Sequence, residues 1–216
     1  MLMPPDLVLF DCDGVLVDSE TLTADVLCEN LARHGLPITR DELSEMFLGG
    51  TMMGVYDQAQ ALGAALPDTW VDDTYIEVFD ALAKDVEPIC GAADILDALD
   101  KAGIPYAVGS NGPHRKMDIT LARTGLISRL RGKVYSREDV PNPKPAPDLY
   151  LKAAWDAGVP PERCVVIEDS PSGARAGIAA GMTCFGFAAE TDPERLRPIC
   201  HQLFYKMEDL PALLGL

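Results

Sequence analysis

The chain has 216 residues, 48% of them apolar, which is enough for a hydrophobic core in one large domain or in one domain with a sizeable insert. Its 34 acidic and 18 basic residues give a formal net charge of −16, which argues against nucleic acids and anionic membranes as partners because they would be repelled. No apolar run of about 18 residues could cross a membrane, and residues 1–5 lack the basic start of a signal peptide. We therefore expect a cytoplasmic globular protein that is a monomer or a weak homodimer.

Residues 7–10 form a short apolar run that is followed by two acidic residues, Asp11 and Asp13, and then by Gly14. Such a run is typical of a buried parallel strand, and ligands in open α/β sheets bind at the carboxyl ends of these strands. Asp11 and Asp13 are therefore candidates for a functional site. If this stretch stood alone, a strand followed by a turn with solvated acids would be the better interpretation.

The six cysteines are scattered along the chain without any Cys-x-x-Cys pair. This spacing favours reduced thiols that pack as small apolar side chains over disulfides or a zinc site. Cys12 lies between the two acids, but the alternation of side chains along a strand turns it away from both of them. We therefore interpret Cys12 as a packing residue.

Between the first strand and Pro88 the chain shows about four helical segments and no strand pattern. The first helix is expected over residues 20–33. The second follows Thr39 and Glu42, which have the spacing of a capping box.

Glycines and an acid mark the other two helices of this stretch. A break at residues 48–50 precedes a third helix that is stopped by Gly63, and Asp68 is expected to cap the fourth. The whole stretch therefore predicts an all-helical insert.

From residue 88 onward, helical and strand patterns alternate, which predicts a doubly wound parallel sheet of the α/β class. Strands are expected at residues 106–109, near 133–135, at 164–167 and at 183–187. We therefore expect an α/β core domain of residues 1–18 and 86–216, with a helical domain of residues 19–85 inserted. In the tail after Asp192 we expect one helix, at residues 207–214.

Three further stretches carry polar residues beside predicted strands or helices: Ser110-Asn111-Gly112, Lys144-Pro145 and Glu168-Asp169-Ser170. Singly, the first is usually a turn and the second usually solvated. In this order, after Asp-x-Asp-Gly-x-x-x-Asp-Ser at residues 11–19, they resemble the motifs of the haloacid dehalogenase-like superfamily of aspartate-nucleophile phosphotransferases. The resemblance covers nearly the whole chain, is weakest over residues 19–88, and is strongest to the helical-cap β-phosphoglucomutases and sugar phosphatases. In that subfamily, the insert is a mobile cap that selects the substrate.

The resemblance implies a role for each acidic residue. Asp11 would attack the phosphorus of a phosphomonoester and form an aspartyl-phosphate, and Asp13 would act as general acid and then as general base. Mg²⁺ would be bound by Asp11, by the main-chain carbonyl of Asp13 and by Asp169, with Glu168 supporting it directly or through water. A cation is also needed because the net charge opposes an anionic substrate.

The same resemblance assigns the phosphate-binding groups. Ser110 and the Asn111 amide would donate hydrogen bonds to phosphate oxygens, and Lys144 would bridge the nucleophile and the phosphate. Relatives that remove halogens lack the acid at the position of Asp13, so this chain is expected to be a phosphatase or a phosphomutase.

The insert favours the phosphatase. The mutases bind a second phosphate with a histidine and an arginine at positions that match Thr23 and Met52 here, and residues 48–66 contain no Arg, Lys or His. We therefore predict hydrolysis of a small phosphorylated metabolite, with a β-phosphoglucomutase as the alternative. A non-catalytic sugar-phosphate sensor is a further alternative, but a sensor would need neither the nucleophile nor its acid/base partner.

Residues 110–117 are also similar to those of bacterial phosphatases of this family that act on small phosphosugar acids such as 6-phosphogluconate. They include His114, Arg115 and Lys116, which fall in the first turn of a predicted helix, where cations oppose the helix dipole. These three residues either contact an anionic substrate or form a solvated helix face.

Overall fold

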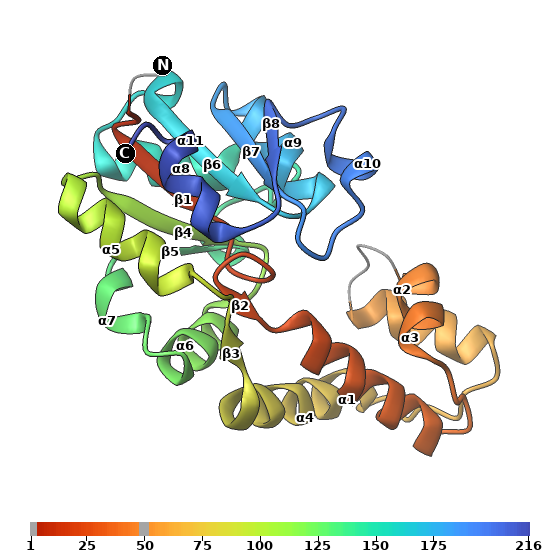
Figure 1. The fold of residues 1–216 in the computed structure, drawn as a ribbon. Coiled ribbons are helices and arrows are strands. Elements are labelled where there is room, and N and C mark those ends of the chain that lie inside the picture. Colours follow the sequence, from red (N-terminus) through yellow and green to blue (C-terminus); the bar gives the residue numbers. More distant parts are fainter. Residues whose placement is uncertain (1–3, 48–51) are drawn as a thin grey trace. The chain divides into compact units, whose positions relative to one another are not determined.

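Parallel strands form the central sheet of this protein (Figure 1). The structure, a computed structural model, describes residues 4–47 and 52–216, and within them the sheet has six strands in the order β5-β4-β1-β6-β7-β8. Their bounds are Leu7–Phe10 for β1, Tyr106–Ser110 for β4, Val134–Ser136 for β5, Cys164–Glu168 for β6, Thr183–Phe187 for β7 and Gln202–Phe204 for β8. The predicted parallel α/β sheet is confirmed.

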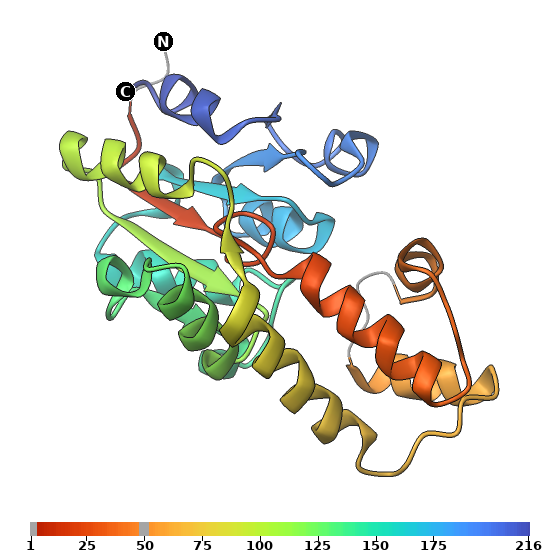
Figure 2. The same cartoon turned by 60° about the horizontal axis from the view of Figure 1, so that its bottom comes forward.

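Helices cover both faces of this sheet (Figure 2). Leu7 and Leu9 of β1 pack in one buried cluster with Tyr150 of α8 and Ala174 of α9, so these two helices cover one face. On the other face lies α5, which contacts α11. The helices of this unit are α5 (Ala92–Ala102), α6 (His114–Arg123), α7 (Ile127–Leu130), α8 (Asp148–Ala157), α9 (Pro171–Ala179), α10 (Pro193–Leu196) and α11 (Leu210–Leu213), with short 3₁₀ helices η1 (Arg137–Asp139), η2 (Pro161–Arg163) and η3 (Met207–Asp209).

The register of the central strands determines which residues meet at the edge of the sheet. Phe10 of β1 is paired with Val108 of β4 and with Ile167 of β6. These strands are parallel, so their carboxyl ends lie at one edge, and the residues that follow them are neighbours.

The chain divides into two compact units, Met1–Asp18 with Glu87–Leu216, and Ser19–Val86. The second unit contains the four predicted helices: α1 (Glu20–Arg33), α2 (Arg40–Phe47), α3 (Met52–Ala61) and α4 (Trp70–Asp85). They enclose their own core, which includes Leu27, Leu31, Val55 and Trp70. The predicted glycine break at residues 48–50 lies outside the described residues.

The capping box before α2 is confirmed. The Thr39 N–H donates to Glu42 Oε2 at 2.8 Å, and the Glu42 N–H donates to Thr39 Oγ1 at 3.2 Å. The predicted cap of α4 was wrong by one residue, because Thr69 rather than Asp68 precedes the helix, and the Thr69 hydroxyl donates to Asp73 Oδ2.

Several short elements were not predicted. Strand β2 (Val17–Asp18) pairs antiparallel with β3 (Glu87–Pro88), so the two connections to the helical unit run side by side. The tail adds α10 and β8, and only its last segment, divided between η3 and α11, matches the predicted helix. Elements of two to four residues contain too few positions to show a periodicity. Within the part of the chain that the structure describes, no helix has the length and apolar character to cross a membrane.

The core of the helical unit contains a buried polar pair that can be tested. Trp70 Nε1 donates a hydrogen bond of 2.5 Å to Asn30 Oδ1, and both residues are buried. Trp70→Phe keeps most of the ring but leaves a buried acceptor without its donor. We expect the free energy of unfolding to fall by about 1–3 kcal/mol.

Urea titration followed by circular dichroism measures this change. Trp155→Phe is the matched control, because Trp155 is 84% exposed and its substitution should change the stability by less than about 0.5 kcal/mol. Equal unfolding midpoints for the two variants would show that the Trp70 hydrogen bond does not stabilise the unit.

Candidate active site

The predicted site residues meet at the carboxyl edge of the sheet. Asp11 follows β1, and its N–H donates to the carbonyl of Ile167 in β6 at 2.9 Å, so the strand pairing continues to the acid. Ser110 ends β4, and Glu168 ends β6. The strand register therefore places these three residues next to one another.

The buried ammonium group of Lys144 connects two of the acids. Its Nζ lies 2.5 Å from Asp11 Oδ1 and 2.6 Å from Glu168 Oε1, and its side chain is 3% exposed. Burial acts to lower the pKa of Lys144, but the two carboxylates outweigh burial and raise it above its usual value. Lys144 therefore stays charged. Its contact with Glu168 was not predicted from the sequence.

Asn111 holds the backbone of Lys144. Its Nδ2 donates to the Lys144 carbonyl at 3.0 Å, and its Oδ1 accepts a hydrogen bond of 3.0 Å from the Lys144 N–H. Both polar atoms of the Asn111 side chain are thus hydrogen-bonded to the backbone of Lys144. The donor that this residue would offer to a phosphate is its backbone N–H.

Glu168 is fully buried and accepts four hydrogen bonds. Oε1 accepts from Lys144 and from the Tyr150 hydroxyl, the latter at 2.9 Å, and Oε2 accepts from the Ser170 N–H and hydroxyl. Four bonds match the acceptor capacity of a carboxylate. Glu168 therefore holds Lys144 in place. Gly173 leaves room for this carboxylate, because a Cβ at position 173 would lie only 1.5 Å from Glu168 Oε1.

Asp13 is held by one side chain from the end of β4 and one from the first turn of α6. Its Oδ1 lies 2.7 Å from Lys116 Nζ, and its Oδ2 accepts a hydrogen bond of 3.2 Å from the Ser110 hydroxyl. Ser110 also accepts a bond of 2.9 Å from the Gly112 N–H. The carboxylate of Asp13 therefore has a defined orientation.

Three carboxylates form a group that can hold a metal ion. One oxygen each from Asp11, Glu168 and Asp169 lies within 4.8 Å of the others. Burial raises the pKa of Asp11 to about 8, with Lys144 opposing the shift and Glu168 adding to it. Hard oxygen donors with excess negative charge suit a cation such as Mg²⁺.

Gly14 allows Asp169 to approach this group. A Cβ at position 14 would lie 2.1 Å from Asp169 Oδ2, and the φ of Gly14 is +79°. Both facts require glycine here. The Asp-Gly turn of the first motif therefore makes room for the last acid.

The three basic residues at the start of α6, His114, Arg115 and Lys116 (the basic triplet), differ in their surroundings. His114 Nε2 lies 2.9 Å from Asp139 Oδ1, and the His114 N–H donates to Glu138 Oε2 at 3.0 Å. Lys116 contacts Asp13. His114 and Lys116 thus both contact acids of the protein, which weakens the prediction that the triplet binds an anionic substrate.

Some residues at the site were not predicted from the sequence. Tyr150 lies on the buried face of α8, where nothing distinguishes it from a core residue. Ser170 follows Glu168 in the last motif and also caps α9 by accepting from the Gly173 N–H. A serine directly before a predicted helix is a typical N-cap, so this role of Ser170 could have been predicted from the sequence.

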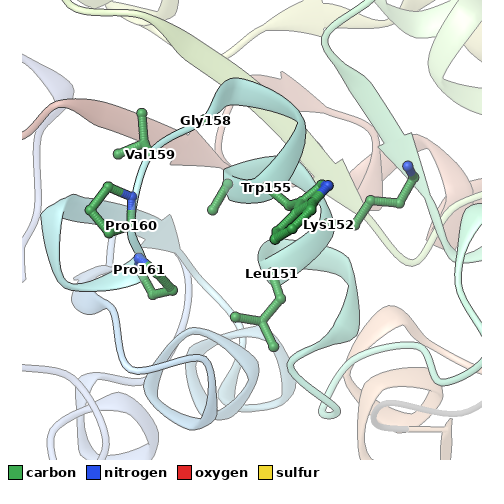
Figure 3. Close-up of a pocket in the computed structure, with 8 residues that line it drawn as sticks. Leu151, Lys152, Trp155, Gly158, Val159, Pro160 and Pro161 are labelled. Atoms are coloured by element: carbon green, nitrogen blue, oxygen red, sulfur yellow. The ribbon is translucent and has the colours of Figure 1, made fainter.

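A hollow of about 860 Å³ lies elsewhere on the unit that contains the sheet (Figure 3). Its lining includes Leu151 and Trp155 of α8 and the turn of Val159, Pro160 and Pro161. None of the predicted site residues lines it. The catalytic prediction therefore depends on the acidic cluster and not on this apolar hollow.

Comparison with known proteins identifies relatives over the full fold. A family model described as haloacid dehalogenase-like hydrolase matches residues 5–181. The chain is 33% identical to the 6-phosphogluconate phosphatase of Escherichia coli K12, covering 95% of this chain and 93% of that protein. It is 32% identical to hexitol phosphatase A of the same organism, covering 88% and 87%.

A solved structure is similar over nearly the whole chain. A HAD family hydrolase from Deinococcus radiodurans R1, crystallised with bound phosphate and sodium, superposes with a TM-score of 0.86 and 36% identity. The match covers 99% of this chain and 96% of that one.

The close approach of Gly173 to Glu168 provides a test of the site. Gly173→Ala in a helix would by itself stabilise the protein by up to about 1 kcal/mol. The new methyl group instead displaces the Glu168 carboxylate and with it Lys144. We expect phosphatase efficiency to fall about 100-fold, because a displacement of about 1 Å can have that effect.

Steady-state kinetics of the purified variant measure this loss. The control is Ser172→Ala, which lies in the same turn of α9 and adds no atom. Unchanged kcat/KM in Gly173→Ala would mean that the position of Glu168 does not affect the reaction.

Proposed function

The chain belongs to the haloacid dehalogenase-like hydrolases and is a phosphatase, and we propose that it hydrolyses small sugar phosphates or phosphosugar acids through an aspartyl-phosphate on Asp11. The observation that carries this proposal is the buried contact of Lys144 with Asp11 and Glu168. This contact holds the Lys144 ammonium group beside the Asp11 carboxylate at the carboxyl edge of the sheet.

In the first step, a carboxylate oxygen of Asp11 attacks the phosphorus, and the bond from phosphorus to the leaving oxygen breaks. The substrate and the nucleophile are both anionic, so the ammonium group of Lys144 is needed to reduce their repulsion. Ser110 and the backbone N–H of Asn111 would donate hydrogen bonds to phosphate oxygens. Asp13 donates a proton to the leaving oxygen, which departs as an alcohol.

In the second step, Asp13, now ionised, removes a proton from a water molecule as that water attacks the aspartyl-phosphate. The bond between phosphorus and Asp11 breaks, which regenerates the carboxylate and releases inorganic phosphate. The proton that Asp13 gave to the alcohol is thereby replaced by one from water.

Mg²⁺ fits the donor set at this edge. The carboxylates of Asp11 and Asp169 and the main-chain carbonyl of Asp13 would hold it, and when bound it would neutralise negative charge on the substrate. Glu168 already accepts four hydrogen bonds, so its contribution would be to keep Lys144 and the neighbouring Asp169 in place.

The helical unit Ser19–Val86 is proposed as the cap that selects the substrate. The hydroxyl of Thr23 donates to the Ser19 carbonyl at 2.7 Å, and Met52 carries no charge. These positions therefore offer no group that could hold the second phosphate of a bisphosphate intermediate, which supports hydrolysis over a mutase reaction.

The direct test is release of inorganic phosphate from 6-phosphogluconate, hexitol phosphates and other small monophosphates in the presence of Mg²⁺. Asp11→Asn keeps the shape of the nucleophile but not its reactivity, and we expect it to lower kcat by at least about 10⁴-fold. Asp94→Asn, an exposed change on α5, is the control and should leave kcat unchanged. Appreciable turnover by Asp11→Asn would contradict the covalent mechanism.

The mutase alternative is tested with β-glucose 1-phosphate, Mg²⁺ and a catalytic amount of the 1,6-bisphosphate. We expect phosphate release. If glucose 6-phosphate formed as fast as the best phosphatase reaction, the assignment would be wrong.

The metal assignment predicts different effects for two acids. Asp169→Ala removes a carboxylate ligand and should weaken Mg²⁺ binding, measured by calorimetry, by at least about 10-fold. Asp13→Asn keeps the backbone carbonyl, so it should bind Mg²⁺ normally while kcat falls about 10²–10⁴-fold. Equal losses of Mg²⁺ affinity in the two variants would show that the side chain of Asp13 is a ligand.

A further inference from the structure

We infer that Lys116 is a positioning residue that orients the carboxylate of Asp13 for proton transfer; this rests on the proposed function. Lys116 Nζ lies 2.7 Å from Asp13 Oδ1, and the side chains are only 19% and 17% exposed. At this depth water competes weakly for the contact, so the pair can hold a fixed geometry.

The location of Lys116 argues for a specific use. It is the third residue of α6, where a cation is opposed by the positive end of the helix dipole. The carboxylate of Asp13 compensates for this placement.

The segment that carries Lys116 is fixed on both sides. The Ser136 hydroxyl donates to the Gly112 carbonyl at 2.8 Å, and the His114 N–H donates to Glu138 Oε2 at 3.0 Å. The first turn of α6 is thus held against the segment after β5. Lys116 is therefore extended from a defined base, as a positioning residue requires.

Three side chains converge over Gly112. A Cβ there would lie 3.2 Å from Ser110 Oγ, 3.5 Å from Lys116 Cδ and 3.6 Å from Asp13 Oδ2. When a substrate phosphate takes the hydrogen bond of Ser110, the contact with Lys116 keeps Asp13 oriented. Lys116 therefore acts through Asp13 and not on the phosphate.

This role predicts a dependence on the leaving group. Sugar phosphates release an alkoxide that must be protonated, whereas p-nitrophenyl phosphate releases a stable phenolate that needs little help from an acid. In Lys116→Met, we expect kcat/KM for the best sugar phosphate to fall at least about 10-fold and that for p-nitrophenyl phosphate to fall less than about 3-fold. Lys116→Arg should recover part of the loss.

The control is Lys152→Met, the same substitution at a lysine that pairs with Asp156 at 2.9 Å on the surface of α8. It should change neither rate. If Lys116→Met is not folded by circular dichroism, Lys116→Gln is used for the same comparison.

A double-mutant cycle with Asp13→Asn separates this role from direct substrate binding. Because Lys116 acts through Asp13, adding Lys116→Met to Asp13→Asn should change kcat/KM less than about 2-fold. Equal losses for both substrates, or a further large loss in the double variant, would overturn the inference. A wild-type protein without phosphatase activity would instead overturn the proposed function.

Discussion

The site depends on the buried ion pairs that the ammonium group of Lys144 makes with Asp11 and Glu168. Removing a charge from water costs several kcal/mol, which only close carboxylates and hydrogen bonds can offset. Here two carboxylates lie within 2.6 Å, and the amide of Asn111 holds the lysine backbone. The lysine is therefore placed beside Asp11, the proposed nucleophile, before any substrate arrives, which is the preorganisation that catalysis by charge requires.

A second lysine repeats this arrangement nearer to solvent. Lys116 approaches Asp13 from α6 as Lys144 approaches Asp11 from the segment before α8. Asp11 and Asp13 therefore each contact a lysine from a different part of the chain. The overall charge of −16 makes these local pairs more important, because the protein as a whole repels an anionic substrate.

The sheet and the position of the site could be predicted because both depend on simple patterns. Apolar runs identified β1, β4, β6 and β7, and parallel pairing places the residues after β1, β4 and β6 together. The contacts that orient the site could not be predicted, because they join positions far apart in sequence. Tyr150 is an ordinary apolar-face residue of α8 until the fold brings its hydroxyl to Glu168.

The paired strands β2 and β3 have a consequence for how this protein can evolve. Val17 lies opposite Pro88, and Asp18 lies opposite Glu87. The two ends of the inserted helical segment are therefore adjacent where they join the sheet unit. An insert whose ends are already joined can change in length or sequence without a new loop-closure cost in the sheet unit. With Ser19–Val86 in its proposed role as the cap, this unit is an exchangeable module, and its replacement would change the substrate range while the candidate active site at the sheet edge is inherited unchanged.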